Sequence, residues 1–156
     1  MKWNKILLAY SCSPNGLRVV DYVGRMYRQL KGVKVTLFYV YDKLPDNTDF
    51  SDTPVTDKLK SAISSLKRRQ EEYRHHMEES KKRLLKMGFA EDQVDVKFVE
   101  KKKNVARQII EEVQKGGYGT VVMGRRGRGN FTSMVFGSVS NAVIQNLSGV
   151  PITIVD

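Results

Sequence analysis

The chain has 156 residues, of which 40% are hydrophobic and 28% are charged, so a disordered chain is excluded and a core of ordinary size is expected. Lys and Arg total 27 against 17 Asp and Glu, and this formal net charge of +10 favours an anionic partner such as a nucleotide, a nucleic acid or an acidic membrane face. A single cysteine, Cys12, excludes an internal disulfide and a multi-cysteine metal cluster.

The first ten residues carry only one short apolar run, which starts at Ile6 and ends at Tyr10. A secretory signal needs a longer apolar stretch and a small-residue cleavage site, and a membrane span needs about 18 apolar residues. The lone cysteine is compatible with a reducing compartment. These features predict a soluble cytoplasmic protein that keeps its N-terminus and forms one domain over residues 1–156.

Five short apolar runs have the length and the β-branched composition of strands. They cover residues 5–9, 34–40, 95–99, 120–123 and 151–155. The first, second and fourth are almost continuously apolar, which is typical of strands that are covered on both faces of a parallel sheet.

Stretches with apolar residues at every third or fourth position separate these runs and predict helices. The first begins with Ser13 as N-cap and Pro14 at the first helical position, and Gly32 marks its end. Its predicted buried stripe consists of Leu17, Val20, Val23, Tyr27 and Leu30. The other predicted helices cover residues 56–87, 104–115 and 137–146. Strands that alternate with helices predict a single-domain α/β protein with an open parallel five-stranded sheet and helices on both faces.

The connection at residues 42–55 is long, polar and rich in aspartate, with two prolines. Loops of this kind are often lids or binding segments and are otherwise disordered connections. Of the two interpretations, the sequence favours the disordered connection.

A glycine-rich segment follows the fourth predicted strand and precedes the last predicted helix. It runs from Met123-Gly124-Arg125 through Gly127 to Gly137-Ser138-Val139. Glycines let a ligand approach the main chain closely, and free amides at a turn or at a helix start bind anions. Arg125, Arg126 and Arg128 add positive charge. The segment therefore predicts a phosphate cradle built mostly from main chain, although it matches neither a Walker A loop nor a dinucleotide fingerprint.

The spacing Gly124-x2-Gly127-x9-Gly137-Ser138 resembles the nucleotide-binding signature of the universal stress protein family. The first strand with the Ser13-Pro14 helix start, and the second, fourth and fifth strands, are also similar to those of the family, so the resemblance covers nearly the whole chain. It implies the strand order 3-2-1-4-5, with a ligand crevice where that order reverses, between the first and fourth strands.

The resemblance also implies the roles of individual residues. In ATP-binding members, the positions of Gly124, Gly127, Gly137, Ser138 and Val139 hold the phosphates and ribose, and the main chain at Val40 faces the adenine. The residues that follow the first and fourth strands flank the crevice. These are Tyr10, Ser11, Ser13, Met123 and Arg125. Ser11 stands where the family usually has an aspartate near the ribose, and a serine hydroxyl binds a ribose hydroxyl more weakly than a carboxylate does.

We therefore expect an adenine-nucleotide-binding module of the stress-response type that takes ATP, with or without Mg²⁺, or else AMP or ADP. No metal site and no catalytic residue are predicted, because residues 113–155 contain no Asp or Glu and the adjacent His75 and His76 do not share a helix face. The alternatives are a slow ATPase and an electrostatic binder of nucleic acid or acidic partners. The apolar last strand should form a sheet edge and predicts a homodimer.

Overall fold

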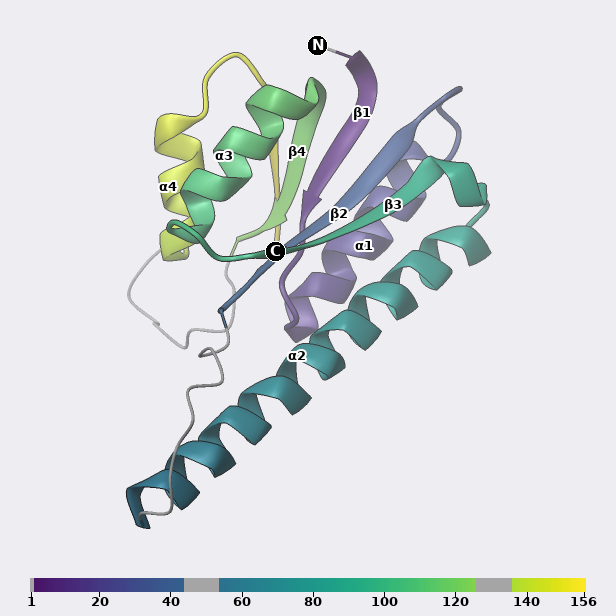
Figure 1. The fold of residues 1–156 in the computed structure, drawn as a ribbon. Helices are drawn as coiled ribbons and strands as arrows, with labels where there is room; N and C mark the ends of the chain where they lie inside the picture. Colours follow the sequence, from purple (N-terminus) through teal and green to yellow (C-terminus); the bar gives the residue numbers. More distant parts are fainter. Residues whose placement is uncertain (1, 44–53, 126–135) are drawn as a thin grey trace.

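The computed structural model describes residues 2–43, 54–125 and 136–156, and within them a parallel sheet with the strand order β3-β2-β1-β4-β5 (Figure 1). The strands are β1 (Lys2–Ala9), β2 (Lys34–Tyr41), β3 (Val94–Glu100), β4 (Tyr118–Gly124) and β5 (Ile152–Val155). All four pairings between neighbouring strands are parallel. The predicted fold class and strand order are confirmed.

Four α-helices connect the strands: α1 (Pro14–Tyr27), α2 (Pro54–Lys86), α3 (Val105–Gly116) and α4 (Ser138–Asn146). A short 3-10 helix, Glu91–Gln93, precedes β3. The largest differences from the predicted bounds are at the start of β1 and at the end of α1, where the helix ends at Tyr27 and a turn leads into β2. Ser13 is the N-cap of α1 and is followed by proline, as predicted.

The two faces of the sheet carry separate apolar cores. On one face, residues such as Ile6, Leu8 and Leu37 pack with Val20 of α1 and Leu84 of α2. On the other, a second cluster joins the sheet to α3 and α4. Figure 1 shows α2 running past the sheet, with its amino-terminal turns extending beyond the carboxyl ends of the strands. No helix in the described ranges has both the length and the apolar character needed to cross a membrane.

The predicted buried stripe of α1 is wrong at its two ends. Leu17 is 44% exposed and Leu30 is 48% exposed, whereas Val19 is buried. Several apolar side chains lie close together in α1, so more than one stripe satisfies the helical period. The sheet selects Val19, Val20 and Val23, because these are the side chains that face it.

A pair of leucine truncations tests this assignment. Leu84→Ala, in the fully buried position on α2, should lower the free energy of unfolding by about 2–5 kcal/mol, because it removes buried apolar surface and leaves a cavity. Leu17→Ala, the same change on the exposed side of α1, should stay within about 0.5 kcal/mol of the unchanged protein. Urea unfolding of both variants measures this, and equal losses would contradict the assignment.

Candidate functional site

The crevice predicted from the strand order lies at the carboxyl end of β1. Ala9, the last residue of β1, is in register with Phe38 of β2 on one side and with Met123 of β4 on the other. The chain order of the sheet reverses at this point, and ligands of open α/β sheets bind beyond the strand ends at such a reversal. The segments that follow β1 and β4 therefore form its two walls.

The first wall begins with Tyr10, which presents main chain rather than side chain. Its ring is buried, and its hydroxyl accepts a hydrogen bond of 3.1 Å from the Ser80 hydroxyl of α2. Burial raises the pKa of this phenol above its ordinary value. The amide of Tyr10 donates to the Phe38 carbonyl at 2.9 Å. The aromatic side chain thus belongs to the core between the sheet and α2.

Ser11 and Ser13 form a compact polar turn on the same wall. Their hydroxyl oxygens lie 2.9 Å apart, and the amide of Ser13 donates to the Ser11 carbonyl at 2.8 Å. Gly16 packs directly on that carbonyl, and a Cβ atom there would lie 1.9 Å from its oxygen. The close packing at Gly16 was not predicted. The sequence does indicate it, because glycine is unusual in the first turn of a helix. Cys12 is half-buried, and its Sγ lies 4.0 Å from the Tyr73 carbonyl of α2.

The second wall starts at Gly124, and Arg125 fixes its geometry. The Arg125 amide donates to the Val155 carbonyl of β5 at 2.8 Å. Its carbonyl accepts from the Gly137 amide at 2.9 Å and from the Ser140 hydroxyl at 2.7 Å. These contacts hold together the two ends of the segment that links β4 to α4. Gly127, Arg126 and Arg128 fall within this segment and lie outside the described residues.

The start of α4 adjoins the second wall, because the Gly137 amide donates to the Arg125 carbonyl. Gly137 is its N-cap, and the first intrahelical bond runs from the Asn141 amide to the Gly137 carbonyl. The amides of Ser138 and Val139 precede that bond and lie at the positive end of the helix dipole. The Ser138 side chain is exposed, and no acidic residue occupies the first turn. This arrangement suits an anion.

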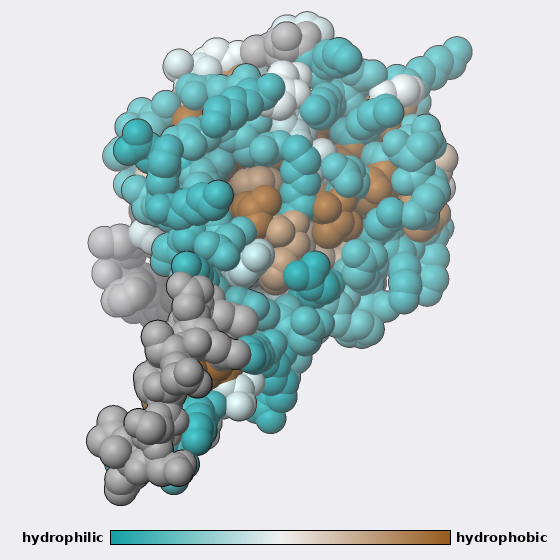
Figure 2. Space-filling model, viewed as in Figure 1, coloured by the Kyte–Doolittle hydropathy of each residue, from teal (hydrophilic) through white to brown (hydrophobic). Residues whose placement is uncertain are grey.

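Apolar side chains adjoin these amides. Ala9, Val40, Met123 and Val139 all belong to the apolar cluster on the α3–α4 face of the sheet, with Val40 and Val139 only half-buried. The cluster therefore puts apolar side chains on the same face of the sheet as the start of α4. On the face seen in Figure 2, hydrophilic residues surround an apolar area in front of the middle of the sheet, which is a different area from the start of α4.

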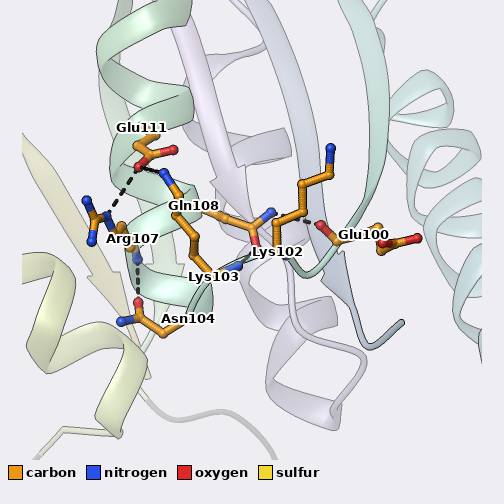
Figure 3. A network of polar contacts seen from close by, with 7 residues as sticks. All are labelled: Glu100, Lys102, Lys103, Asn104, Arg107, Gln108 and Glu111. Carbon is orange, nitrogen blue, oxygen red and sulfur yellow. Dashed lines mark hydrogen bonds and ion pairs between the residues drawn. The ribbon is translucent and has the colours of Figure 1, made fainter. Parts of the chain in front are cut away.

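A polar loop between β3 and α3, joined by several hydrogen bonds, lies at the same end of the sheet (Figure 3). The Gln108 side chain donates to the Glu100 carbonyl at 2.9 Å and accepts from the amides of Lys102 and Lys103 at 2.8 and 3.1 Å. Asn104 caps α3 by accepting from the Arg107 amide at 2.8 Å. The helix start was predicted from the sequence, but the role of Gln108 was not. A single side chain that forms hydrogen bonds with the preceding loop leaves no periodic pattern in the sequence.

Among the described residues, two carboxylates that directly follow strands, Asp42 after β2 and Asp156 after β5, are ion-paired. Asp156 lies 2.8 Å from Nε of Arg125, and Asp42 lies 3.0 Å from Nζ of Lys101. Asp156 therefore competes with phosphate for the side chain of Arg125. This aspartate directly follows residues 113–155, the stretch that contains no Asp or Glu. Most of the loop at 42–55 lies outside the described residues, so the lid interpretation stays a prediction.

The hydrogen bonds of the Ser140 hydroxyl to the Arg125 and Gly137 carbonyls can be tested by substitution. Ser140→Ala should lower the free energy of unfolding by about 1 kcal/mol, because it removes a buried hydroxyl that bridges the Arg125 and Gly137 carbonyls. Ser138→Ala, the matched change at an exposed hydroxyl two residues earlier, should leave stability nearly unchanged. Chemical denaturation measures both, and a larger loss in Ser138→Ala would contradict the assigned bridging role.

Comparison with known proteins identifies the fold and the family. A solved structure of the hypothetical protein MJ0577 matches with a TM-score of 0.73 and 24% identity over 99% of this chain and 96% of that one. A universal stress protein solved with cAMP matches with a TM-score of 0.62 and 17% identity, covering 99% of this chain and 98% of that one. One from Archaeoglobus fulgidus solved with dAMP matches with a TM-score of 0.53 and 16% identity, covering 97% and 96%. A search of curated proteins found no match. The profile of the Universal stress protein family matches residues 2–156, and the chain belongs to that family.

Proposed function

We propose that this protein binds an adenine nucleotide, ATP in the first instance, at the carboxyl ends of β1, β2 and β4. The observation that carries the proposal is the start of α4, where amides and the exposed Ser138 stand beside the apolar cluster of Val40, Met123 and Val139. Helix amides favour phosphate, and the apolar surface favours the purine ring. The structures of relatives with cAMP and dAMP support the same ligand class.

Each part of the crevice has a role in this proposal. The amides of Ser138 and Val139 hold the phosphates, together with the glycine-rich main chain at Gly124 and Gly127. The Gly137 amide already donates to Arg125, so Gly137 acts through its small size and by closing the segment. Ser11 and Ser13 offer hydroxyls to the ribose, and the weaker acceptor at Ser11 lowers the affinity relative to an aspartate. The main chain at Val40 faces the adenine.

The module acts as a stress-response protein in the cytoplasm, and nucleotide hydrolysis is absent or slow. Hydrolysis needs a general base or a carboxylate that holds Mg²⁺. Among the described residues, Asp42 and Asp156, which directly follow β2 and β5, are each engaged by a cation. Rapid phosphate release from ATP that is lost in Asp42→Asn would favour the ATPase alternative instead.

A charge introduced at the helix start tests nucleotide binding. Ser138→Asp should weaken ATP binding by about tenfold or more, because it puts a carboxylate where the phosphates sit. The fold should survive, since an acidic residue stabilises a helix start. Isothermal titration of the purified protein with ATP and with AMP measures the effect, and the loss should be larger for ATP.

The matched control is Ser148→Asp, the same change at an exposed position just beyond the end of α4. It should leave ATP affinity nearly unchanged. Absence of ATP and AMP binding in the unchanged protein, or equal weakening by both variants, would contradict the proposal.

The homodimer is proposed to form through the free edge of β5. β5 is the last strand of the sheet and is half-exposed and uncharged. The carbonyls of Pro151 and Val155 accept from β4, at Val121 and Arg125. Because alternate residues of a strand point their main-chain groups to opposite sides, those of Ile152 and Ile154 face the open edge. Open apolar edges invite pairing with a second chain.

Removal of one outward amide tests this edge. Ile154→Pro deletes an amide that no strand of the described sheet uses, so the protein should stay folded by circular dichroism while sedimenting as a monomer. Ile144→Lys, at an exposed position on α4, is the control and should sediment like the unchanged protein. If Ile154→Pro unfolds, Ile152→Lys replaces it. A folded edge variant that remains a dimer would contradict this interface.

A further inference from the structure

A cavity of about 620 Å³ lies at the amino ends of the strands, opposite to the nucleotide crevice. Its walls come from the first residues of β1, β2, β3 and β4, from the 3-10 helix and from Lys81 of α2. Four lysines line it: Lys5, Lys34, Lys81 and Lys97. The proposed function uses none of these residues.

Two of these lysines, Lys5 and Lys34, are direct neighbours in register on adjacent strands. They lie on the same face of the sheet, since each is separated by an even number of residues from Leu7 or Phe38 in the apolar cluster of that face. Like charges directly opposite each other destabilise a sheet. An anionic group bound between the two lysines would turn this destabilising contribution into a stabilising one.

The two lysines differ in how the fold engages them. Lys5 donates to the Gly116 carbonyl at 2.7 Å and lies 4.4 Å from the centre of the Tyr118 ring, so two of its three ammonium hydrogens remain for a ligand. Lys34 is exposed and forms no ion pair with any residue in the described ranges. Its charge is therefore available at the mouth of the cavity.

The wall beside these lysines is ordered and polar. Tyr118 and Thr36 are 1% and 4% exposed. The Tyr118 hydroxyl donates to Glu112 at 2.9 Å, and Lys97 donates to the same carboxylate oxygen at 2.7 Å. Glu112 thus neutralises Lys97 and leaves Lys5 and Lys34 as the positive centre of this wall. Burial raises the pKa of Tyr118, which keeps the phenol neutral.

Carboxylates among the lining residues limit the size and charge of a ligand, and one of them, Asp95, is in register with Thr36 on the same face as the two lysines. Glu91 is paired with Lys81 at 2.5 Å, and Asp92 and Asp95 also line the cavity. These carboxylates repel an extended polyanion such as a nucleic acid. They tolerate a small molecule that carries its anionic group at one end only, toward Lys5 and Lys34.

We propose that this cavity binds a small metabolite through one phosphate or carboxylate group held between Lys5 and Lys34. The site is separate from the nucleotide crevice, because the two lie at opposite ends of the same strands. The geometry gives the protein a second anionic ligand, bound by side-chain ammonium groups rather than by helix amides.

The test titrates isotopically labelled protein with inorganic phosphate and, separately, with acetate, and follows the amide resonances. Saturable shifts should gather at Lys34, Thr36, Val94 and Tyr118. Lys34→Gln should weaken the binding by about tenfold, because one charge-assisted hydrogen bond is lost. Saturation by phosphate alone assigns a phosphoryl ligand, and saturation by acetate alone assigns a carboxylate.

The matched control is Lys31→Gln, which removes the same charge from an exposed residue in the turn before β2. It should leave the affinity nearly unchanged. Three results would overturn the proposal: no saturable shift with either anion, shifts confined to the start of α4, or equal weakening in both variants. ATP binding should be the same in Lys34→Gln and the unchanged protein, so the result does not depend on the nucleotide crevice.

Discussion

The pairing of β1 with a parallel strand on each side is the constraint on which the rest of the structure depends. β2 and β4 flank it, and the four residues Ile6–Ala9 are buried. Because both neighbours are parallel, the connections must cross over the sheet, which places α1 and α2 on one face and α3 and α4 on the other. The proposed crevice at the end of β1 is expected from this placement, since the chain leaves β1 and β4 toward opposite faces.

Much of this fold could be predicted from the sequence, because a strand covered on both faces needs an almost unbroken apolar run. Residues 5–9 and 120–123 carry that signal and are central strands. Which side of α1 faces the sheet was harder to predict from the sequence. Leu17 fits the helical period as well as Val19 does, and only the tertiary packing decides that Leu17 faces solvent, whereas Leu30 lies beyond the end of the helix at Tyr27.

The candidate site was predictable to the extent that glycine and helix-start patterns are local. The spacing of Gly124, Gly137 and Ser138 predicted that the segment after β4 belongs to the site. In the structure the Gly137 amide donates to the Arg125 carbonyl. The contacts that hold this geometry are not local. Ser140 reaches Arg125 across 15 positions and Arg125 reaches Asp156 across 31, and such pairs form only after β4, α4 and β5 have packed together.

The two proposed sites, at opposite ends of this sheet, rely on different physical means of holding an anion. In a parallel α/β sheet the helix starts gather at the carboxyl ends of the strands, where unpaired amides and the positive ends of the dipoles favour an anion without any charged side chain. The helix ends gather at the amino ends, where the dipole is negative, so an anion there depends on lysines. The ammonium group of Lys5 already offsets the negative end of the α3 dipole, because it donates to the Gly116 carbonyl. Lys34 offsets the dipole of none of the described helices. Exposed ammonium groups are screened by salt, so ionic strength should separate binding at the two ends.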